Sequence, residues 1–488
     1  MRVKMILPAL TEAKSPYWRP IKYSLFPPLG LALLAAYLDP DDIVDLQDEH
    51  VETLTLDDRP DLVVIEVYIT SAHRAYELAD LYRARGSYVC LGGLHVTACP
   101  QEASLHADTV FCGPGEDTWP AFLKDFCQGR PDVLYRSTQR NLTGIPPLRR
   151  DLIKRANYLV PNSLIVSRGC PHACDFCYKE SFFRGGRSFY TLAVDRALEE
   201  IESLPGRHLF FLDDNLLGDR PFALALFDGM RGMGRLWQAA GTVSSVLDSA
   251  LLDRAAQSGL TSLFIGFETL NPDNLRQQHK LQNVGRNYDQ VVHRLHDRGV
   301  MVNASFVFGM DGDRPSVFDR TVEWAISRGI ETATFHILTP YPGSRLYDRM
   351  QQANRIRTRD WRLYDTRHCV YEPTGMTTSQ LESGYRRAYE TFYRWSSILR
   401  AARLKPDIRS ILRHLAYTGG WKKFELGWGL IIKTGLVGSM RPLLEEILAG
   451  FGRQANRRDL GARPTRMEQI EHTEDKPSAP DSIRCGSK

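Results

Sequence analysis

The chain has 488 residues, of which 43% are hydrophobic and 25% charged, the composition of a folded globular protein with two or three domains. Its formal net charge of +4 is too small to indicate a nucleic-acid partner, and we expect none. The apolar run at the amino terminus is too short for a signal peptide, so we expect a cytoplasmic protein whose first residues form a strand.

The stretch 1–135 is predicted to form a Rossmann-like domain, because strand patterns alternate with helical ones and such alternation indicates a parallel sheet. The predicted strands are Val3–Leu7, Asp42–Leu46, Leu62–Val67, Tyr88–Gly92 and Thr109–Cys112, with helices at Leu29–Leu38, Ser71–Arg85 and Thr118–Cys127. Ligands of parallel sheets bind at the carboxyl ends of the strands. The segments at those ends are rich in glycine and proline, and glycine lets the backbone approach a flat or bulky ligand closely.

A second series of strands and helices follows the connector 136–160 and extends over residues 161–345. Its predicted strands are Leu164–Ser167, His208–Leu212, Trp237–Ser245, Ser262–Phe267, Val302–Phe308 and Thr332–Leu338, and its helices include Ala193–Ser203 and Arg286–Arg298. Six strand–helix units are too few for the full eight-stranded barrel. The overall class is therefore α/β, with two parallel-sheet domains in succession.

Three cysteines, Cys170, Cys174 and Cys177, follow the first strand of this second domain with the spacing C-x3-C-x2-C. Three thiolates can hold a [4Fe–4S] cluster and leave one iron free for another ligand, so we expect these cysteines to be catalytic. The alternative is a structural zinc site with His172 as fourth ligand, which would close the coordination shell. Zinc does not account for the strand before the loop or for the barrel pattern after it, so the cluster is the preferred interpretation.

The cysteine spacing, followed directly by Tyr178, resembles that of the radical SAM superfamily. The resemblance implies that the six strand–helix units form a partial (β/α)6 barrel of the TIM type, as in radical SAM cores. The resemblance implies that the open iron binds S-adenosylmethionine (SAM) and that an external donor of the flavodoxin or ferredoxin type supplies the electron. In α/β barrels the active site lies at the carboxyl ends of the strands, and in this family those ends surround SAM. The residues implied as SAM contacts are Phe176, Asp213, Asp214, Ser245, Glu268 and Phe308.

Several of these residues also have ordinary structural interpretations. Phe176 would equally serve as a core aromatic beneath the loop, and an aspartate before a helix is commonly a cap. An ionised Glu268 at the end of an apolar strand needs a hydrogen-bond donor. His336 and Tyr341, at the end of the sixth strand, are expected on the substrate side of the barrel, although a lone histidine in a strand is more often a core residue.

The glycine-rich segments of the first domain resemble the cobalamin-binding domain of B12-dependent radical SAM enzymes. The resemblance rests on Gly92-Gly-Leu-His-Val-Thr97 and Gly113-Pro-Gly-Glu116, and it covers most of residues 1–135. The residues implied as cobalamin contacts are Pro28, Gly30, Gly93, His95, Gly115 and Glu116. The Asp-x-His-x-x-Gly signature of a cobalt-ligating histidine is absent, since Asp48-Glu-His-Val-Glu52 lacks its order and its glycine. A generic sheet domain without cobalamin is the alternative.

The remaining chain is predicted to contain a post-barrel and helical region at 346–451 and a disordered tail at 452–488, which has few large apolar residues. Between Arg386 and Arg441 twelve Lys or Arg stand against three acidic residues. The apolar stretch Leu426–Met440 is too short to span a bilayer. We expect peripheral membrane contact through 386–441, with an ordinary helical cap on the barrel as the alternative.

The two resemblances together imply a cobalamin-dependent radical SAM methyltransferase. In such an enzyme one SAM gives the 5′-deoxyadenosyl radical that takes hydrogen from an unactivated carbon, and a second SAM remethylates the cobalt that donates the methyl group. The expected substrate is a small-molecule or lipid-like natural product. Two alternatives stay open: a radical cyclase, ring-rearranging or oxidising enzyme of the same fold, and a non-catalytic iron–sulfur or cobalamin sensor.

Overall fold

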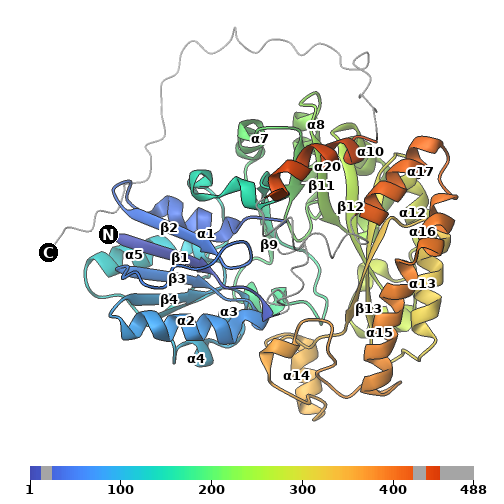
Figure 1. Ribbon diagram of the computed structural model, residues 1–488. Coiled ribbons are helices and arrows are strands. Elements are labelled where there is room, and N and C mark those ends of the chain that lie inside the picture. The colour runs from blue at the N-terminus through green and yellow to red at the C-terminus, as the bar shows by residue number, and fades with distance from the viewer. Residues whose placement is uncertain (12–24, 421–435, 451–488) are drawn as a thin grey trace, which may run out of the picture.

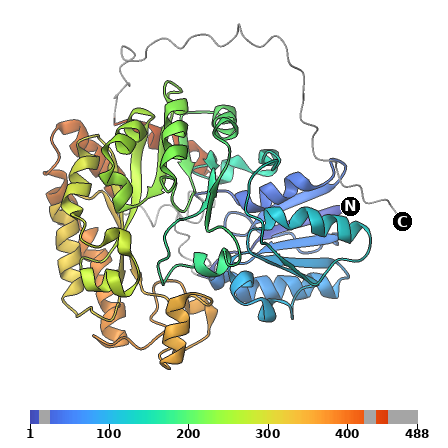
Figure 2. The ribbon, with the colours of Figure 1, turned by 180° about the vertical axis from the view of Figure 1, so that it is seen from behind.

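The structure is a computed structural model and describes residues 1–11, 25–420 and 436–450. An amino-terminal sheet domain and a barrel-like domain lie side by side, and helices that follow the barrel pack on its outer side (Figures 1 and 2). The predicted tail 452–488 and most of Leu426–Met440 lie outside the described residues. Among the residues described, no helix has both the length and the apolar character needed to cross a membrane.

The amino-terminal sheet has six parallel strands in the order β2-β1-β3-β4-β5-β6. Their bounds are β1 Arg2–Leu7, β2 Ile43–Asp48, β3 Leu62–Glu66, β4 Tyr88–Gly92, β5 Thr109–Cys112 and β6 Leu134–Arg136, and the helices are α1 Leu29–Leu34, α2 Ala72–Ala84, α3 Leu94–Ala98, α4 Pro100–Ala103 and α5 Trp119–Cys127. The sequence pattern does not predict β6, because only Tyr135 of its three residues is buried. The winding reverses between β1 and β3, and ligands bind at such a switch point.

The second sheet also has six parallel strands, in the order β7-β10-β11-β12-β13-β14, so the sheet grows in one direction along the chain. The bounds are β7 Ser163–Leu164, β10 His208–Phe211, β11 Leu236–Gly241, β12 Leu260–Glu268, β13 Met301–Phe308 and β14 Thr332–Ile337. Between the strands run α7 Val194–Ser203, α8 Arg220–Met230, α10 Ser249–Gln257, α12 Tyr288–His296 and α13 Val317–Ser327. This arrangement confirms the predicted α/β class with a partial (β/α)6 barrel.

One barrel strand ends earlier than predicted. β11 stops at Gly241 instead of continuing to Ser245, because the Thr242 side chain accepts a hydrogen bond from Ser245 N and caps the short helix α9 Val243–Leu247. A local side-chain hydrogen bond of this kind offers the backbone an alternative to the strand ladder.

Further helices follow the barrel strands in the chain, and one of them covers the last strand. They are α14 Arg345–Gln352, α15 Thr378–Phe392, α16 Trp395–Ala402, α17 Ile408–His414 and α20 Arg441–Leu448. α15 lies along the free edge of β14, where Tyr389 and Tyr393 replace a neighbouring strand. Each hydroxyl accepts a hydrogen bond from a strand N–H and donates one to the C=O of the same residue, Phe335 or Ala333, at 2.9–3.2 Å. The sheet edge is thus satisfied by side chains.

Candidate functional site

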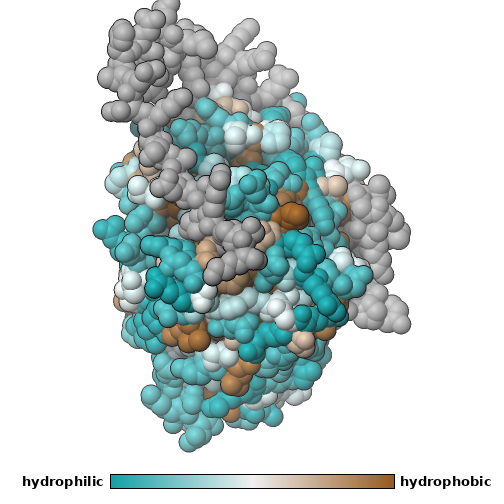
Figure 3. All heavy atoms as spheres, turned by 90° about the vertical axis from the view of Figure 1, so that its left-hand side faces the viewer, coloured by the Kyte–Doolittle hydropathy of each residue, from teal (hydrophilic) through white to brown (hydrophobic). Residues whose placement is uncertain are grey.

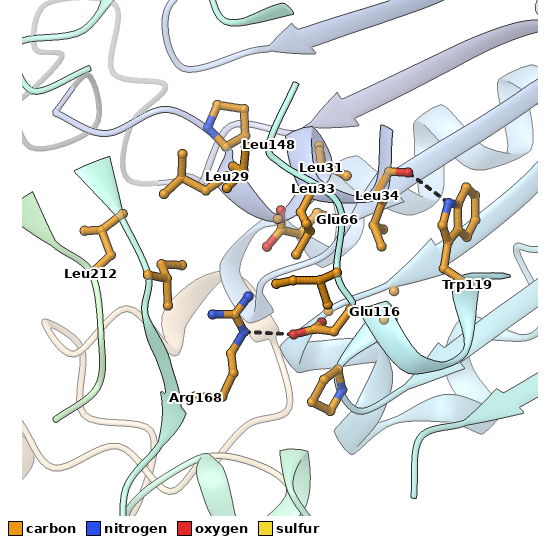
Figure 4. A pocket seen from close by; sticks show the side chains of 18 of the residues that line it. Leu29, Leu31, Leu33, Leu34, Glu66, Glu116, Trp119, Leu148, Arg168 and Leu212 are labelled. Atoms are coloured by element: carbon orange, nitrogen blue, oxygen red, sulfur yellow. Dashed lines mark hydrogen bonds and ion pairs between the residues drawn. The ribbon is translucent and has the colours of Figure 1, made fainter. Parts of the chain in front are cut away.

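A cavity of about 700 Å³ lies between the two domains, at the carboxyl ends of the strands of both sheets (Figure 4). Leu7 and Glu66, at the ends of β1 and β3, line it from the amino-terminal domain and place it at the switch point of that sheet. Ile165 and Leu212, directly after β7 and β10, line it from the barrel. Leucines of α1 form an apolar wall: Leu29, Leu31, Leu33 and Leu34. A cavity of this volume takes a ligand of cofactor size.

Most of the predicted cobalamin contacts surround this cavity. The residues that line it are Pro28, Gly30, Gly93, Gly115 and Glu116. Gly93 has φ +108°, and a Cβ at this position would lie 2.9 Å from Val67 O, so the backbone there requires glycine. His95 does not line the cavity. It is buried in α3, where its Nε2 lies 3.2 Å from Glu102 and its ring meets the edge of the Trp361 ring, so it packs the first domain against the post-barrel segment.

Charged and phenolic side chains line the cavity in hydrogen-bonded pairs. Arg168 Nε donates to Glu116 Oε1 at 2.8 Å, and both side chains are largely buried (Figure 4). This ion pair joins the Gly-Pro-Gly-Glu segment of the first domain to the strand that leads into the cysteine loop. The Glu66 carboxyl shares a hydrogen bond with the Tyr68 phenol, and burial raises the pKa of Glu66.

The cavity fits a large flat ring system such as a corrin, since it combines an apolar wall with glycines that bring backbone close to the ligand. No histidine, cysteine, methionine or lysine is among the described residues that line it. His50, the histidine of the incomplete signature, lies elsewhere in the first domain. Its Nδ1 is 2.7 Å from Asp48 Oδ1, and its Nε2 accepts a hydrogen bond from Leu10 N at 3.1 Å. Both ring nitrogens therefore have partners outside the cavity.

The chain enters the cysteine loop through a short antiparallel pair instead of the single predicted strand. Residues Ser167–Gly169 form β8, which pairs with β9 Phe189–Thr191. Gly169 has φ +75°, and a Cβ there would lie 2.0 Å from Ser188 O. The backbone can make this turn only with glycine.

The three cysteines have partners that suit thiolate ligands. Cys170 and Cys174 are buried, and Cys177 is half-buried. Asn215 Nδ2 lies 3.6 Å from Cys170 Sγ, and Gln282 Nε2 lies 3.5 Å from Cys174 Sγ. Hydrogen bonds to ligand sulfurs tune an iron–sulfur cluster, so this donor set fits one.

Two lysines place positive charge beside the cysteine loop. Burial works against the charge of Lys179, but the cysteine sulfurs raise its pKa. Lys280 Nζ lies 2.7 Å from Glu268 Oε1 and 6.0 Å from the centre of the Phe176 ring. Burial opposes this charge too, but Glu268 raises the pKa of Lys280. Phe176 and Glu268, two of the residues predicted to contact SAM, thus both lie near Lys280, next to the cysteines.

The backbone at Glu268 is strained. Its φ is +65°, although it is not a glycine, and the pairing of β12 with β13 is irregular between Gly266 and Glu268. Residues in this conformation persist where the surrounding structure holds them, and they cluster at functional sites. The buried Glu268 carboxylate has the donor that its position requires in Lys280.

The two aspartates after β10 have different surroundings. Asp213 is buried and accepts hydrogen bonds from the backbone N–H of Val166 and Ser167, and burial raises its pKa to about 6. It therefore holds the backbone between β7 and β8. Asp214 lines the cavity and accepts a hydrogen bond from the Tyr178 phenol. Tyr178 lines the cavity as well, so this pair connects the cysteine loop to it.

Ser245 and Phe308, two further predicted SAM contacts, have structural partners. The Ser245 hydroxyl lies 2.6 Å from Thr242 Oγ1 in the cap of α9. Phe308 is buried in the barrel core, where its ring stacks on Phe335 with the ring centres 5.6 Å apart. Neither residue lines the cavity between the domains.

The predicted substrate-side residues lie on and after β14. His336 Nδ1 is 3.1 Å from Thr366 Oγ1. Tyr341 is half-buried and packs against the apolar core of the first domain. The structure brings neither of them into the lining of the large cavity.

Sequence reasoning predicted Glu116 and Asp214 as site residues but missed their partners Arg168 and Tyr178, and it also missed Lys280. Tyr178 and Arg168 stand next to the cysteines in sequence, but nothing in the sequence identifies Asp214 and Glu116 as their partners. Lys280 follows a helix with no motif around it. The one signal for it was the need of a buried Glu268 for a donor.

Comparison with known proteins identifies two families. Residues 164–344 match the radical SAM superfamily, and residues 23–123 match the B12 binding domain. The bacteriochlorophyllide d C-12(1)-methyltransferase of Chlorobaculum tepidum is 30% identical over 359 residues, which cover 71% of this chain and 77% of that protein. The bacteriochlorophyllide d C-8(2)-methyltransferase of the same organism is 26% identical over 400 residues, 76% of this chain and 86% of that protein.

Other relatives are named for other substrates and outcomes. The hopanoid C-2 methylase of Rhodopseudomonas palustris is 26% identical over 68% of this chain and 66% of that protein. The anaerobic magnesium-protoporphyrin IX monomethyl ester cyclase of Rubrivivax gelatinosus is 23% identical over 75% of this chain and 74% of that protein. Among solved structures, the radical SAM methyltransferase TsrM of Kitasatospora setae, with cobalamin and a [4Fe–4S] cluster bound, shares the fold. Its TM-score is 0.60 at 14% identity, over 90% of this chain and 99% of that chain.

These matches confirm the cofactors expected from the sequence, a [4Fe–4S] cluster, SAM and cobalamin. They also confirm an enzyme of the C-methyltransferase type as the main interpretation. The chain therefore belongs to the radical SAM superfamily, in the group whose members carry a B12-binding domain ahead of the radical SAM domain.

Proposed function

We propose that this B12-dependent radical SAM methyltransferase acts on an unactivated carbon of a polycyclic, largely apolar molecule. The observation that carries the proposal is the cavity between the two domains. Tyr178 and Arg168, next to the cysteines, line it from one side, and Glu66 and Gly93 of the B12-binding domain line it from the other. The relatives named for a bacteriochlorophyllide and for a hopanoid support the substrate class.

The proposed roles of the residues follow from their surroundings. When bound, the cluster with SAM supplies hydrogen abstraction from carbon, and cobalamin supplies the methyl group. Cys170, Cys174 and Cys177 hold the cluster, with amide N–H groups directed at two of the sulfurs. Glu268 and its partner Lys280 hold the polar end of SAM beside the cysteines.

The leucine wall and the glycine edge are proposed to hold the B12 ring system and to keep water away from the reacting carbon. The Arg168–Glu116 ion pair fixes the B12-binding domain against the cluster loop. Small errors in the placement of reacting groups are costly for rate, so this contact positions the two halves of the site.

We also propose that the protein works in the cytoplasm and receives electrons from a flavodoxin- or ferredoxin-type donor. A reducing compartment suits a chain whose cysteines serve as cluster ligands. The donor class can be tested by replacing a chemical reductant with reduced flavodoxin in the assay below.

The test is anaerobic turnover of the full chain reconstituted with iron, sulfide and hydroxocobalamin. Bacteriochlorophyllide d and a hopanoid are offered as substrates with SAM and a reductant. Methyl transfer predicts S-adenosylhomocysteine and 5′-deoxyadenosine in about equal amounts, together with a methylated product, and the Cys170→Ala/Cys174→Ala/Cys177→Ala variant serves as the control without a cluster.

A radical cyclase is the second candidate, because one relative bears that name. It predicts 5′-deoxyadenosine without S-adenosylhomocysteine. A non-catalytic sensor predicts neither product from a cluster-loaded protein. Measuring 5′-deoxyadenosine and S-adenosylhomocysteine separately therefore distinguishes all three functions.

A further inference from the structure

Helices α16 and α17 lie next to each other at the outer side of the barrel, away from the B12-binding domain (Figures 1 and 2). Several of their large apolar side chains are exposed. We call them the α16–α17 surface: Trp395, Leu399, Leu404, Ile408 and Leu412, with exposed fractions of 45–66%. Trp395 and Leu399 are four residues apart on α16, as are Ile408 and Leu412 on α17, so each pair shares a helix face. Leu404 lies in the connection between the helices.

Other residues of the same segment hold it on the barrel. Ile398 of α16 is buried, and Arg413 of α17 donates a hydrogen bond to Thr261 O. Lys405, in the connection, forms a buried ion pair with Glu331. The buried contacts of the segment are thus made mainly by other residues, and about half of the surface of each exposed apolar side chain is left without a use in the fold.

The charges around this surface are mainly positive. The exposed basic residues of the two helices and their connection are Arg394, Arg400, Arg403 and Arg409. Arg400 forms an ion pair with the exposed Glu323 of α13 at 2.6 Å. The exposed acidic residue there, Asp407, caps α17 by accepting a hydrogen bond from Ser410 N. Leucine, isoleucine and tryptophan side chains bordered by arginines are typical of helices that lie in the headgroup region of anionic membranes.

The opposite face of the molecule differs. The side formed by the B12-binding domain is mostly hydrophilic, and apolar residues occur there in small separate spots (Figure 3). Single exposed apolar residues need no explanation, whereas a group that covers two adjacent helices indicates a binding surface.

We propose that the α16–α17 surface docks the protein on a membrane that carries anionic lipids. The apolar side chains insert at the level of the headgroups, and Arg394, Arg403 and Arg409 contact lipid phosphates. A second copy of the chain fits this surface less well, because a two-fold contact would bring the arginines of both copies together. The inference goes beyond the proposed function, since it involves neither the cofactors nor the cavity.

The test is vesicle flotation of the full chain, without cofactors or substrate. Vesicles of phosphatidylcholine alone are compared with vesicles that also contain phosphatidylglycerol. Wild type is expected to float with the anionic vesicles. Leu399→Ser/Ile408→Ser should weaken binding on the order of tenfold per side chain. Arg403→Gln/Arg409→Gln should weaken binding to the anionic vesicles by about fivefold per arginine.

The matched control is Leu105→Ser/Val133→Ser, because these side chains are 73% and 74% exposed on the B12-binding domain. It should float like wild type, and circular dichroism checks that all variants are folded. The proposal is overturned if wild type does not float with anionic vesicles, or if Leu399→Ser/Ile408→Ser floats as well as the control. It is also overturned if ultracentrifugation shows a dimer that this double variant dissociates while vesicles bind neither form.

Discussion

Replacing Arg168 with methionine is expected to loosen the contact between the two domains. The Arg168 guanidinium reaches Glu116 of the other domain at 2.8 Å, and only 17% and 11% of the two side chains are exposed. Removal of one partner leaves the other charge buried and unpaired, which costs about 3–5 kcal/mol in buried pairs. Since both side chains border a cavity, we expect the lower end of that range, about 3 kcal/mol.

The assay is urea unfolding of the full chain in a double-mutant cycle of Arg168→Met and Glu116→Gln. Each single variant should have a lower free energy of unfolding than wild type. The double variant should lose clearly less free energy of unfolding than the two single variants together, which corresponds to a coupling energy of about 2 kcal/mol. Arg276 and Asp273 form the control pair at 2.6 Å, with side chains 57% and 83% exposed, and should couple by less than about 0.5 kcal/mol. Additive effects at Arg168 and Glu116, or a coupling no larger than that of the control, would refute the reasoning.

Three further predictions concern single positions. Gly93→Ala should lower the cobalt bound per chain and reduce the free energy of unfolding by about 1–3 kcal/mol, because a Cβ would meet Val67 O. The control Gly86→Ala, where φ is +86° and the space around the residue is open, should retain cobalt. Equal cobalt content in the two variants would contradict this prediction. Glu268→Gln should destabilise the protein by about 3 kcal/mol, because Lys280 loses its carboxylate partner. It should also weaken SAM binding, measured by equilibrium dialysis. Unchanged stability and SAM affinity would argue against the proposed role of the Glu268–Lys280 ion pair. Burial raises the pKa of Asp213 to about 6, so the native state keeps this proton between about pH 4 and 6, where an unfolded aspartate has lost it. The stability that the proton confers is present below pH 4 and is lost as the pH rises through 6. Wild type should therefore lose up to about 3 kcal/mol relative to Asp213→Asn between pH 4 and 7, and a difference that does not change with pH would contradict the assignment.

Local sequence patterns predicted most of the strands and helices of the fold. A buried strand such as Tyr88–Gly92 has the same bounds in the sequence prediction and in the structure, because a parallel strand covered on both faces is a short apolar run between turns. The cysteine triad is local in the same sense. Ser245 is an example of a position that local patterns do not predict. The Thr242 side chain accepts a hydrogen bond from Ser245 N, and this cap ends β11 before the apolar pattern ends.

The site itself depends on contacts between segments far apart in the chain. Arg168 and Glu116 are separated by 52 positions, and their pairing follows only once the two domains are docked. His95 belongs to a segment typical of the B12-binding domain, yet its side chain turns to Glu102 and Trp361 instead of the cavity. A sequence motif fixes the path of the backbone more firmly than the direction of each side chain.

The phenols of Tyr389 on α15 and of Tyr393, the residue directly after that helix, cover the edge strand of an unclosed barrel. Their hydroxyl groups bond to the strand as the peptide groups of a neighbouring strand would. The peptide groups of Ala333 and Phe335 on β14 are therefore not available to pair with a strand of another protein. The aperture between the first and last strand then stays open without the risk of aggregation. The sheet can therefore end at β14 without pairing with β7, while these peptide groups of its edge still have hydrogen-bond partners.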